Sequence, residues 1–255
     1  MDMVWRVLFI LLALSLVSCG MSQKKVQQRQ RAVLHMQIAD SLLANGKLPE
    51  ALAELNMAEQ LAPRDAVIQS KIGLVYQLRE KPEEAEKRFR RALDLSPNFT
   101  DVHAQLARLY IDTNRLEKAL SEVGYLESDM TYPYPEKSLQ LKGMIYFKQE
   151  KFKEAEPLLE RSYQAQRTNC ITSYFLGRTY YAQKKLKESA QVLDQAVKNC
   201  ESAKFEEPLF YSAMAYYEQG QKMQAKARAE ELVLKYNKSP LAKKAEGLLN
   251  ILDEL

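Results

Sequence analysis

The chain of 255 residues is poor in the residue types that most often carry catalysis or bind metals. It has two histidines and three cysteines, which leaves little for histidine-based catalysis, histidine-rich metal sites or a zinc module. Glycine (8) and proline (9) are also scarce, whereas residues that lose little conformational freedom in a helix are abundant. The composition therefore predicts an all-α protein that is not an enzyme and needs no metal or cofactor.

A block of charge of one sign is missing as well. The 37 lysine and arginine residues are interleaved with 33 aspartate and glutamate residues, and the net charge is +4. Binding to a nucleic-acid backbone depends on neutralising a row of phosphates. We therefore expect no nucleic-acid partner.

Apolar residues are concentrated at the N-terminus, where 14 of the first 18 residues are hydrophobic. Arg6 precedes an apolar run from Val7 to Val17. A run of this length is too short for the roughly 20 residues of a membrane-spanning helix but is typical of a signal peptide. We expect residues 1–18 to be a signal peptide that is removed.

The residues that follow this run, Leu16-Val17-Ser18-Cys19-Gly20, resemble the lipobox of bacterial lipoproteins. The resemblance implies that Cys19 carries lipid and becomes the first residue, and several acyl chains suffice for stable anchoring. Ordinary secretion with an incidental cysteine is the alternative. Residues 19–31 are then a lipidated tether, since 20–31 are polar and without periodicity. By the same resemblance, Gly20 after the cysteine favours the outer membrane, with the protein facing the periplasm.

The remaining sequence repeats itself with a period of 34 residues. Small residues recur at positions eight and twenty of three successive units, 32–65, 66–99 and 100–133. They are Ala39, Gly73 and Ala107 at position eight, and Ala51, Ala85 and Ala119 at position twenty. This pattern resembles the tetratricopeptide repeat, in which small residues let helices A and B of a hairpin approach closely. Pro63 and Pro97 are placed to end helix B.

Three further units follow, at 136–169, 170–203 and 206–239, with two-residue insertions before the first and the last of them. Ser239-Pro240 is a helix start signal, and it opens a helix over 240–255 with apolar residues along one face. A terminal helix of this kind closes the exposed core of a solenoid. We predict that 32–255 is a tetratricopeptide-repeat domain, an all-α superhelical solenoid of six helix hairpins plus a C-terminal capping helix.

The histidines and the two remaining cysteines have defined places in this repeat. His35 and His103 occupy position four, where we expect packing side chains and not metal ligands. Cys170 and Cys200 lie at the start of helix A and the end of helix B of the fifth unit, which a hairpin brings to the same edge. In an oxidising compartment they can form a disulfide, which would contribute about 3–4 kcal/mol in the chain-entropy model. Two free thiols are the alternative.

In tetratricopeptide solenoids the inner wall is lined by helix A residues at positions two, five, nine and twelve. We expect a partner-binding groove at these positions of units one to three, because their large apolar side chains suit a peptide. The residues are Val33, Met36, Asp40 and Leu43, then Val67, Ser70, Leu74 and Gln77, then Asp101, Ala104, Arg108 and Ile111. The same positions of units four to six carry aromatic residues and Arg178. Burial of part of this stripe between neighbouring A helices is the alternative.

A lipobox, a brief tether and six such units together resemble the type IV pilus pilotin lipoproteins. The turn Asp129-Met130-Thr131-Tyr132-Pro133-Tyr134-Pro135-Glu136 also looks like one that this family carries. The resemblance implies an accessory protein that binds subunits of the outer-membrane secretin and promotes their localisation and assembly. We expect it to be monomeric when unbound. A lipoprotein scaffold for another envelope assembly, in outer-membrane protein assembly or as a cell-wall hydrolase adaptor, is the alternative.

Overall fold

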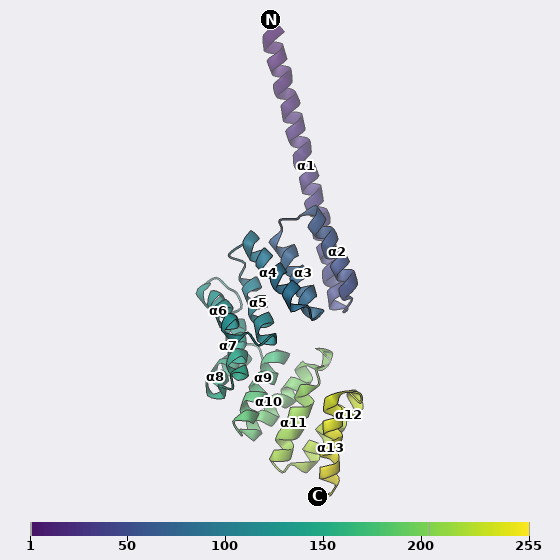
Figure 1. The fold of residues 1–255 in the computed structure, drawn as a ribbon, viewed down its shortest axis with the longest axis vertical. Coiled ribbons are helices and arrows are strands. Elements are labelled where there is room, and N and C mark those ends of the chain that lie inside the picture. The colour runs from purple at the N-terminus through teal and green to yellow at the C-terminus, as the bar shows by residue number, and fades with distance from the viewer. Residues whose placement is uncertain (1, 204, 255) are drawn as a thin grey trace. The chain divides into compact units, whose positions relative to one another are not determined.

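A computed structural model describes residues 2–203 and 205–254, with side chains from Gln23 onward except that of Ser202. The described residues form thirteen α-helices and one 3-10 helix (Figure 1). They divide into two compact units, Met1–Leu109 and Tyr110–Leu255. The boundary between these units falls inside the range 32–255 that the sequence assigns to one repeat domain.

The first unit contains four helices and the start of a fifth. They are α1 (Asp2–Ala44), α2 (Leu48–Leu61), α3 (Ala66–Leu78), α4 (Pro82–Leu95) and α5 (Thr100–Asp112). Each of the first four packs on its neighbour in sequence. The core between α1, α2 and α3 is made of alanine and branched aliphatic side chains, among them Ala39, Ala51, Leu55 and Ile72.

The second unit continues the pattern. Its helices are α6 (Leu116–Ser128), α7 (Pro135–Lys148), α8 (Phe152–Ala165), α9 (Cys170–Ala182), α10 (Leu186–Asn199), η1 (Glu201–Ala203), α11 (Glu207–Glu218), α12 (Lys222–Lys235) and α13 (Pro240–Glu254). Sequence neighbours pack together from α6 to α13, and α9 also contacts α7 and α11. Contacts limited to near neighbours are the hallmark of a solenoid.

The starts of the second helices of the hairpins show the period directly. These helices begin at Leu48, Pro82, Leu116, Phe152, Leu186 and Lys222. The spacing is 34 residues except at the two places where the sequence shows two-residue insertions. The predicted all-α array of hairpins is confirmed.

Glycine at the eighth position lets two helices of a hairpin touch. A Cβ added to Gly73 would lie 2.7 Å from the Phe89 ring. At Gly177 the same added atom would lie 2.6 Å from Leu193 Cγ. Any larger residue would push the helices of the hairpin apart.

The turn inside each hairpin contains one residue in the left-handed region, always at position fifteen. Two of these are glycines, Gly46 (φ 70°) and Gly220 (φ 74°). The other four are Glu80, Asn114, Glu150 and Lys184, with φ between 56° and 60°. A left-handed non-glycine residue costs about 1–2 kcal/mol. The packing of the two helices offsets this cost and holds the turn in place.

Helix α1 runs through the segment expected to be a tether. Residues 20–31 continue the helix, and the described side chains from 23 to 31 are exposed. Glutamine, lysine and arginine are good helix formers, so a segment without an apolar face still extends a helix that is packed further on. The side chains of the expected signal peptide and of Cys19 lie outside the described residues. Within the described part of the chain, no helix is long and apolar enough to cross a membrane.

The last helix, α13, closes the second unit. Ser239 caps it, since the Ala242 amide donates to Ser239 Oγ at 2.9 Å. Its side chains Ala245, Leu248 and Leu252 are buried against α11 and α12. The cap and the apolar face are those that the sequence indicates.

Candidate protein-binding surface

The expected groove positions on α1 and α3 present partly exposed apolar side chains. Val33 and Val67 are both 41% exposed, and Met36, Leu43 and Leu74 are half-buried. Met36 and Leu43 also pack in part against the core between α1, α2 and α3. They form an accessible apolar surface on the first unit, together with half-buried Gln77.

Three of the twelve residues predicted to line the groove are buried, so the prediction is wrong for them. Ser70 is 4% exposed, Ala104 is 2% exposed and Ile111 is 1% exposed. Ser70 Oγ donates a hydrogen bond to Gln105 Oε1 at 2.8 Å, which links α3 to α5. The repeat fixes the position of a residue on its helix, but the spacing between successive first helices decides whether that position reaches the surface.

Charged residues frame the apolar surface. Exposed Asp40 on α1 pairs with Lys71 Nζ on α3 at 2.6 Å. This ion pair ties the two first helices together at the surface and occupies one predicted binding residue. Asp101 and Arg108 on α5 are half-buried.

On the second unit, aromatic rings from α7, α9 and α11 surround Arg178. Arg178 Cζ lies 3.5 Å from the centre of the Tyr211 ring and 5.4 Å from that of Phe147. Arg178 Nη1 donates to the Tyr174 hydroxyl at 2.8 Å. The pattern in the sequence marks Phe147, Tyr174 and Arg178 as surface positions, but Tyr211, at position six, is outside it.

Burial changes the chemistry of Tyr174. Desolvation raises the pKa of its hydroxyl to about 12, although nearby Arg178 opposes the change. The hydroxyl therefore stays neutral under ordinary conditions and serves as a hydrogen-bond acceptor for Arg178.

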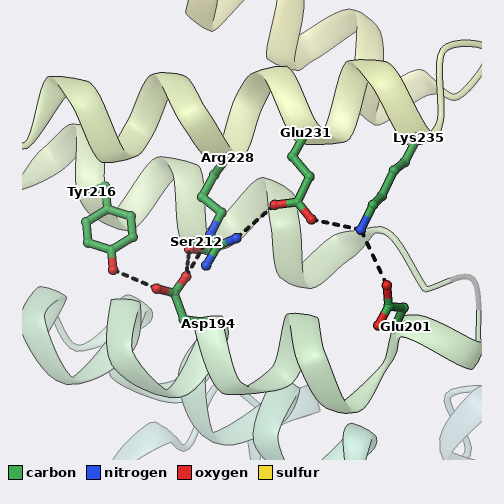
Figure 2. A network of polar contacts seen from close by, with 7 residues as sticks. All are labelled: Asp194, Glu201, Ser212, Tyr216, Arg228, Glu231 and Lys235. Atoms are coloured by element: carbon green, nitrogen blue, oxygen red, sulfur yellow. Dashed lines mark hydrogen bonds and ion pairs between the residues drawn. The ribbon is translucent and has the colours of Figure 1, made fainter.

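A polar network joins α10, α11 and α12, as Figure 2 shows. Asp194 accepts hydrogen bonds from Ser212 Oγ (2.6 Å), the Tyr216 hydroxyl (2.7 Å) and Arg228 Nε (2.9 Å). Arg228 Nη1 also donates to Glu231 at 2.8 Å. Because these contacts join α10 to α11 and α12, the network holds the last two hairpins together.

A pocket lies on the first unit, between α2, α3 and α4. It has a volume of about 720 Å³ and is lined by Glu59, Gln69 and Arg88 among other polar residues. Arg88 Nη1 donates to Glu59 Oε1 at 2.6 Å. Burial of Glu59 tends to raise its pKa, but the hydrogen bonds from Gln69 and Arg88 outweigh it and the pKa is lowered. Glu59, Gln69 and Arg88 are therefore hydrogen-bonded to one another in the wall of this pocket.

The histidines occupy packing positions. His35 Nδ1 lies 2.6 Å from Glu54 Oε2 on α2, and His103 is 8% exposed. Among the described residues no three histidine, cysteine, aspartate or glutamate side chains are grouped in a way that could hold a metal ion.

Cys170 and Cys200 are joined in a disulfide, with their Cα atoms 4.9 Å apart. The bond links the first residue of α9 to the residue that ends α10. Of the two states that the sequence leaves open, the structure contains the bridged one.

Comparison with known proteins supports the repeat. Family models described as tetratricopeptide repeat match residues 78–124, 141–204 and 209–239. No curated protein matches the sequence.

Solved structures share the fold. PilF from Pseudomonas aeruginosa is 16% identical, with a TM-score of 0.70 over 87% of this chain and 99% of its own. PilW, described as a widely conserved type IV pilus biogenesis factor, is 20% identical, with a TM-score of 0.71 over 84% of this chain and 97% of its own. The Cut9–Hcn1 structure of the APC/C is 14% identical, with a TM-score of 0.76 over 87% of this chain and 43% of its own. At these identities the likeness establishes the fold alone.

Proposed function

The chain is a tetratricopeptide-repeat protein, and we propose that it is an outer-membrane lipoprotein that binds secretin subunits. In this role it promotes their localisation and assembly for type IV pilus biogenesis. The observation that carries the proposal is the accessible apolar surface of α1 and α3, around Val33 and Val67. Such a surface suits a protein segment and has no catalytic group at hand.

Two solved structures support a role in type IV pilus biogenesis. PilF and PilW match this chain over nearly their whole length, and PilW is described as a factor in type IV pilus biogenesis. Cut9–Hcn1 shows that the same fold also serves a different assembly, so the role needs a direct test.

The proposed mechanism joins two parts of the chain. Lipid on Cys19 keeps the protein at the inner face of the outer membrane. The apolar surface of α1 and α3 covers an aggregation-prone segment of the secretin until subunits associate. When secretin subunits associate, their own interface buries this segment. The secretin then dissociates from the apolar surface.

A deletion strain tests the role in assembly. We expect loss of heat-resistant secretin multimers from the outer membrane, and their recovery when the gene is restored. Multimers in normal amount in the deletion strain would disprove the proposed role. Capture of another envelope assembly in place of secretin would favour the alternative scaffold.

Surface variants test the binding site itself. The double variant Val33→Asp, Val67→Asp places charges on the apolar surface, and we expect it to retain about a tenth or less of secretin in affinity capture. The control is Met57→Asp, on α2, which changes a side chain that is 50% exposed outside the predicted positions. Equal capture of secretin by both variants would show that the surface of α1 and α3 is not the binding site.

A further inference from the structure

Arg178 has no carboxylate partner in the part of the chain that the structure describes. Among the described residues its one hydrogen bond is the one from Nη1 to the Tyr174 hydroxyl. Its Nε is buried and has no acceptor. Arginine has five N–H donors, so most of the binding capacity of this side chain is unused.

The aromatic rings around Arg178 hold it in place. Tyr211 lies against the guanidinium, with Phe147 and Tyr174 beside it. Tyr174 is in turn packed edge-on against Phe175 and, at 4.7 Å, against Phe205. Stacking on rings offsets part of the cost of burying the charge but supplies no acceptor for its N–H groups.

Two carboxylates, Glu218 and Glu207, act on tyrosines of α9. Lys184 pairs with Glu218 at 2.7 Å, and the Tyr181 hydroxyl also donates to Glu218. Glu207, in the first turn of α11, acts on Tyr174, where it raises the pKa of the hydroxyl. None of these carboxylates is hydrogen-bonded to Arg178.

We propose that Phe147, Tyr174, Arg178 and Tyr211 form a second subsite, which binds an aspartate or glutamate side chain flanked by apolar residues in a partner protein. The guanidinium is the complementary group for such a carboxylate, and charge-assisted pairs of this kind are among the stronger hydrogen bonds. The rings supply contact area for the apolar neighbours of the acid. This inference deepens the proposed function, because it adds a charged contact on the second unit to the apolar surface on the first.

The test uses two short peptides that differ in one group. Acetyl-Phe-Asp-Phe-amide and acetyl-Phe-Asn-Phe-amide are titrated into the isotope-labelled protein while the Arg178 Nε–Hε signal is followed by NMR. We expect the acidic peptide to shift this signal and to bind about tenfold more tightly or better than the amide. Equal binding, or no shift with either peptide, would overturn the proposal. Both peptides are used with the unaltered protein, so a variant that fails to fold cannot hide the result.

Two variants then locate the effect. Arg178→Gln removes the charge, and we expect the preference for the acidic peptide to disappear. Lys184→Gln is the matched control, because it removes a cation that lies 5.5 Å from the Tyr181 ring but is already paired. Loss of the preference in the control and not in Arg178→Gln would also contradict the proposal.

Secretin capture separates this inference from the proposed function. If secretin binds through α1 and α3 but the peptides show no preference, only the Arg178 subsite fails. If no secretin binds while the acidic peptide does, the subsite stands and serves another partner.

Discussion

Gly143 and Gly177 show how a single missing side chain sets the distance between two helices. A Cβ on Gly143 would meet Leu159 Cγ at 2.6 Å, and the side chain of Leu159 is completely buried. A buried leucine in a close-packed hairpin has no free space into which it can shift. At these positions, glycine acts through packing and not through its freedom of backbone angle.

A pair of alanine variants measures this effect. Gly177→Ala places a methyl group against Leu193, and we expect a loss of about 1–3 kcal/mol in the free energy of unfolding. Gly247→Ala, on exposed α13 surface with no atom within 4 Å of the added Cβ, should gain about 0.5–1 kcal/mol. Urea unfolding of both variants checks the pair. Similar effects at the two sites would mean that helix propensity and not packing decides.

The surroundings of Tyr216 predict that the free energy of unfolding falls at high pH. Its burial and its hydrogen bond to Asp194 raise the pKa to about 12 from 10.0. The unfolded chain releases this proton near pH 10 while the folded chain retains it, so the free energy of unfolding falls as pH rises from 10 toward 12. Below pH 10 the contribution is fully present.

The variant Tyr216→Phe tests this origin. We expect a smaller fall in melting temperature between about pH 9 and 11 than in the unaltered protein, since one of the shifted groups is gone. Exposed Tyr134→Phe is the control and should leave the slope unchanged. An equal slope in all three proteins would assign the alkaline loss to other groups.

At the scale of elements, the disulfide holds one hairpin closed. Cys170 and Cys200 lie 30 residues apart in sequence, at the open end of the α9–α10 hairpin. The next segment leads from this end through η1 to α11. The bond therefore fixes the edge from which the sixth hairpin begins.

Replacing both cysteines by serine should lower the free energy of unfolding by about 3–4 kcal/mol, because the closed loop no longer restricts the unfolded chain. Thermal unfolding of the double variant beside the oxidised protein measures the loss. Alkylation without reductant provides the direct check: labelling of both thiols in protein purified without reductant would show that the bridge is absent.

At the scale of the whole molecule, the described helices contact near neighbours in sequence. Each additional hairpin therefore adds exposed surface and does not enlarge a single central core. The first buried side chain among the described residues is Ala32, well after the expected lipid site. The residues before it contribute no described side chain to the packed core. The packed core of the described residues therefore lies apart in sequence from the proposed lipid site.

Cys19→Ala tests that separation. We expect an unchanged far-UV spectrum and melting temperature for the domain, with the protein lost from the outer-membrane fraction. The physical reason is that the proposed acyl chains would supply the anchoring free energy, and the variant removes their attachment site while it leaves the buried core intact. Normal fractionation of the variant would count against lipidation.

The repeat pattern was enough to predict the hairpins, the small residues at their crossings and the cap at Ser239. It was less informative about surfaces: it placed Ser70, Ala104 and Ile111 in the groove although they are buried. The pattern also did not indicate that Tyr211 contacts Arg178, because position six is not one of the positions that line the inner wall. The left-handed residues at Glu150 and Lys184 were equally hidden, because neither is a glycine.

By itself the sequence determined the secondary structure, the period and the places where helices touch, because these depend on spacing within a single hairpin. The tertiary structure alone decided which first-helix side chains reach the surface and that Arg178 has no carboxylate partner among the described residues. Those properties depend on the distance between hairpins and on residues from three helices at once, and a 34-residue period does not record either of them.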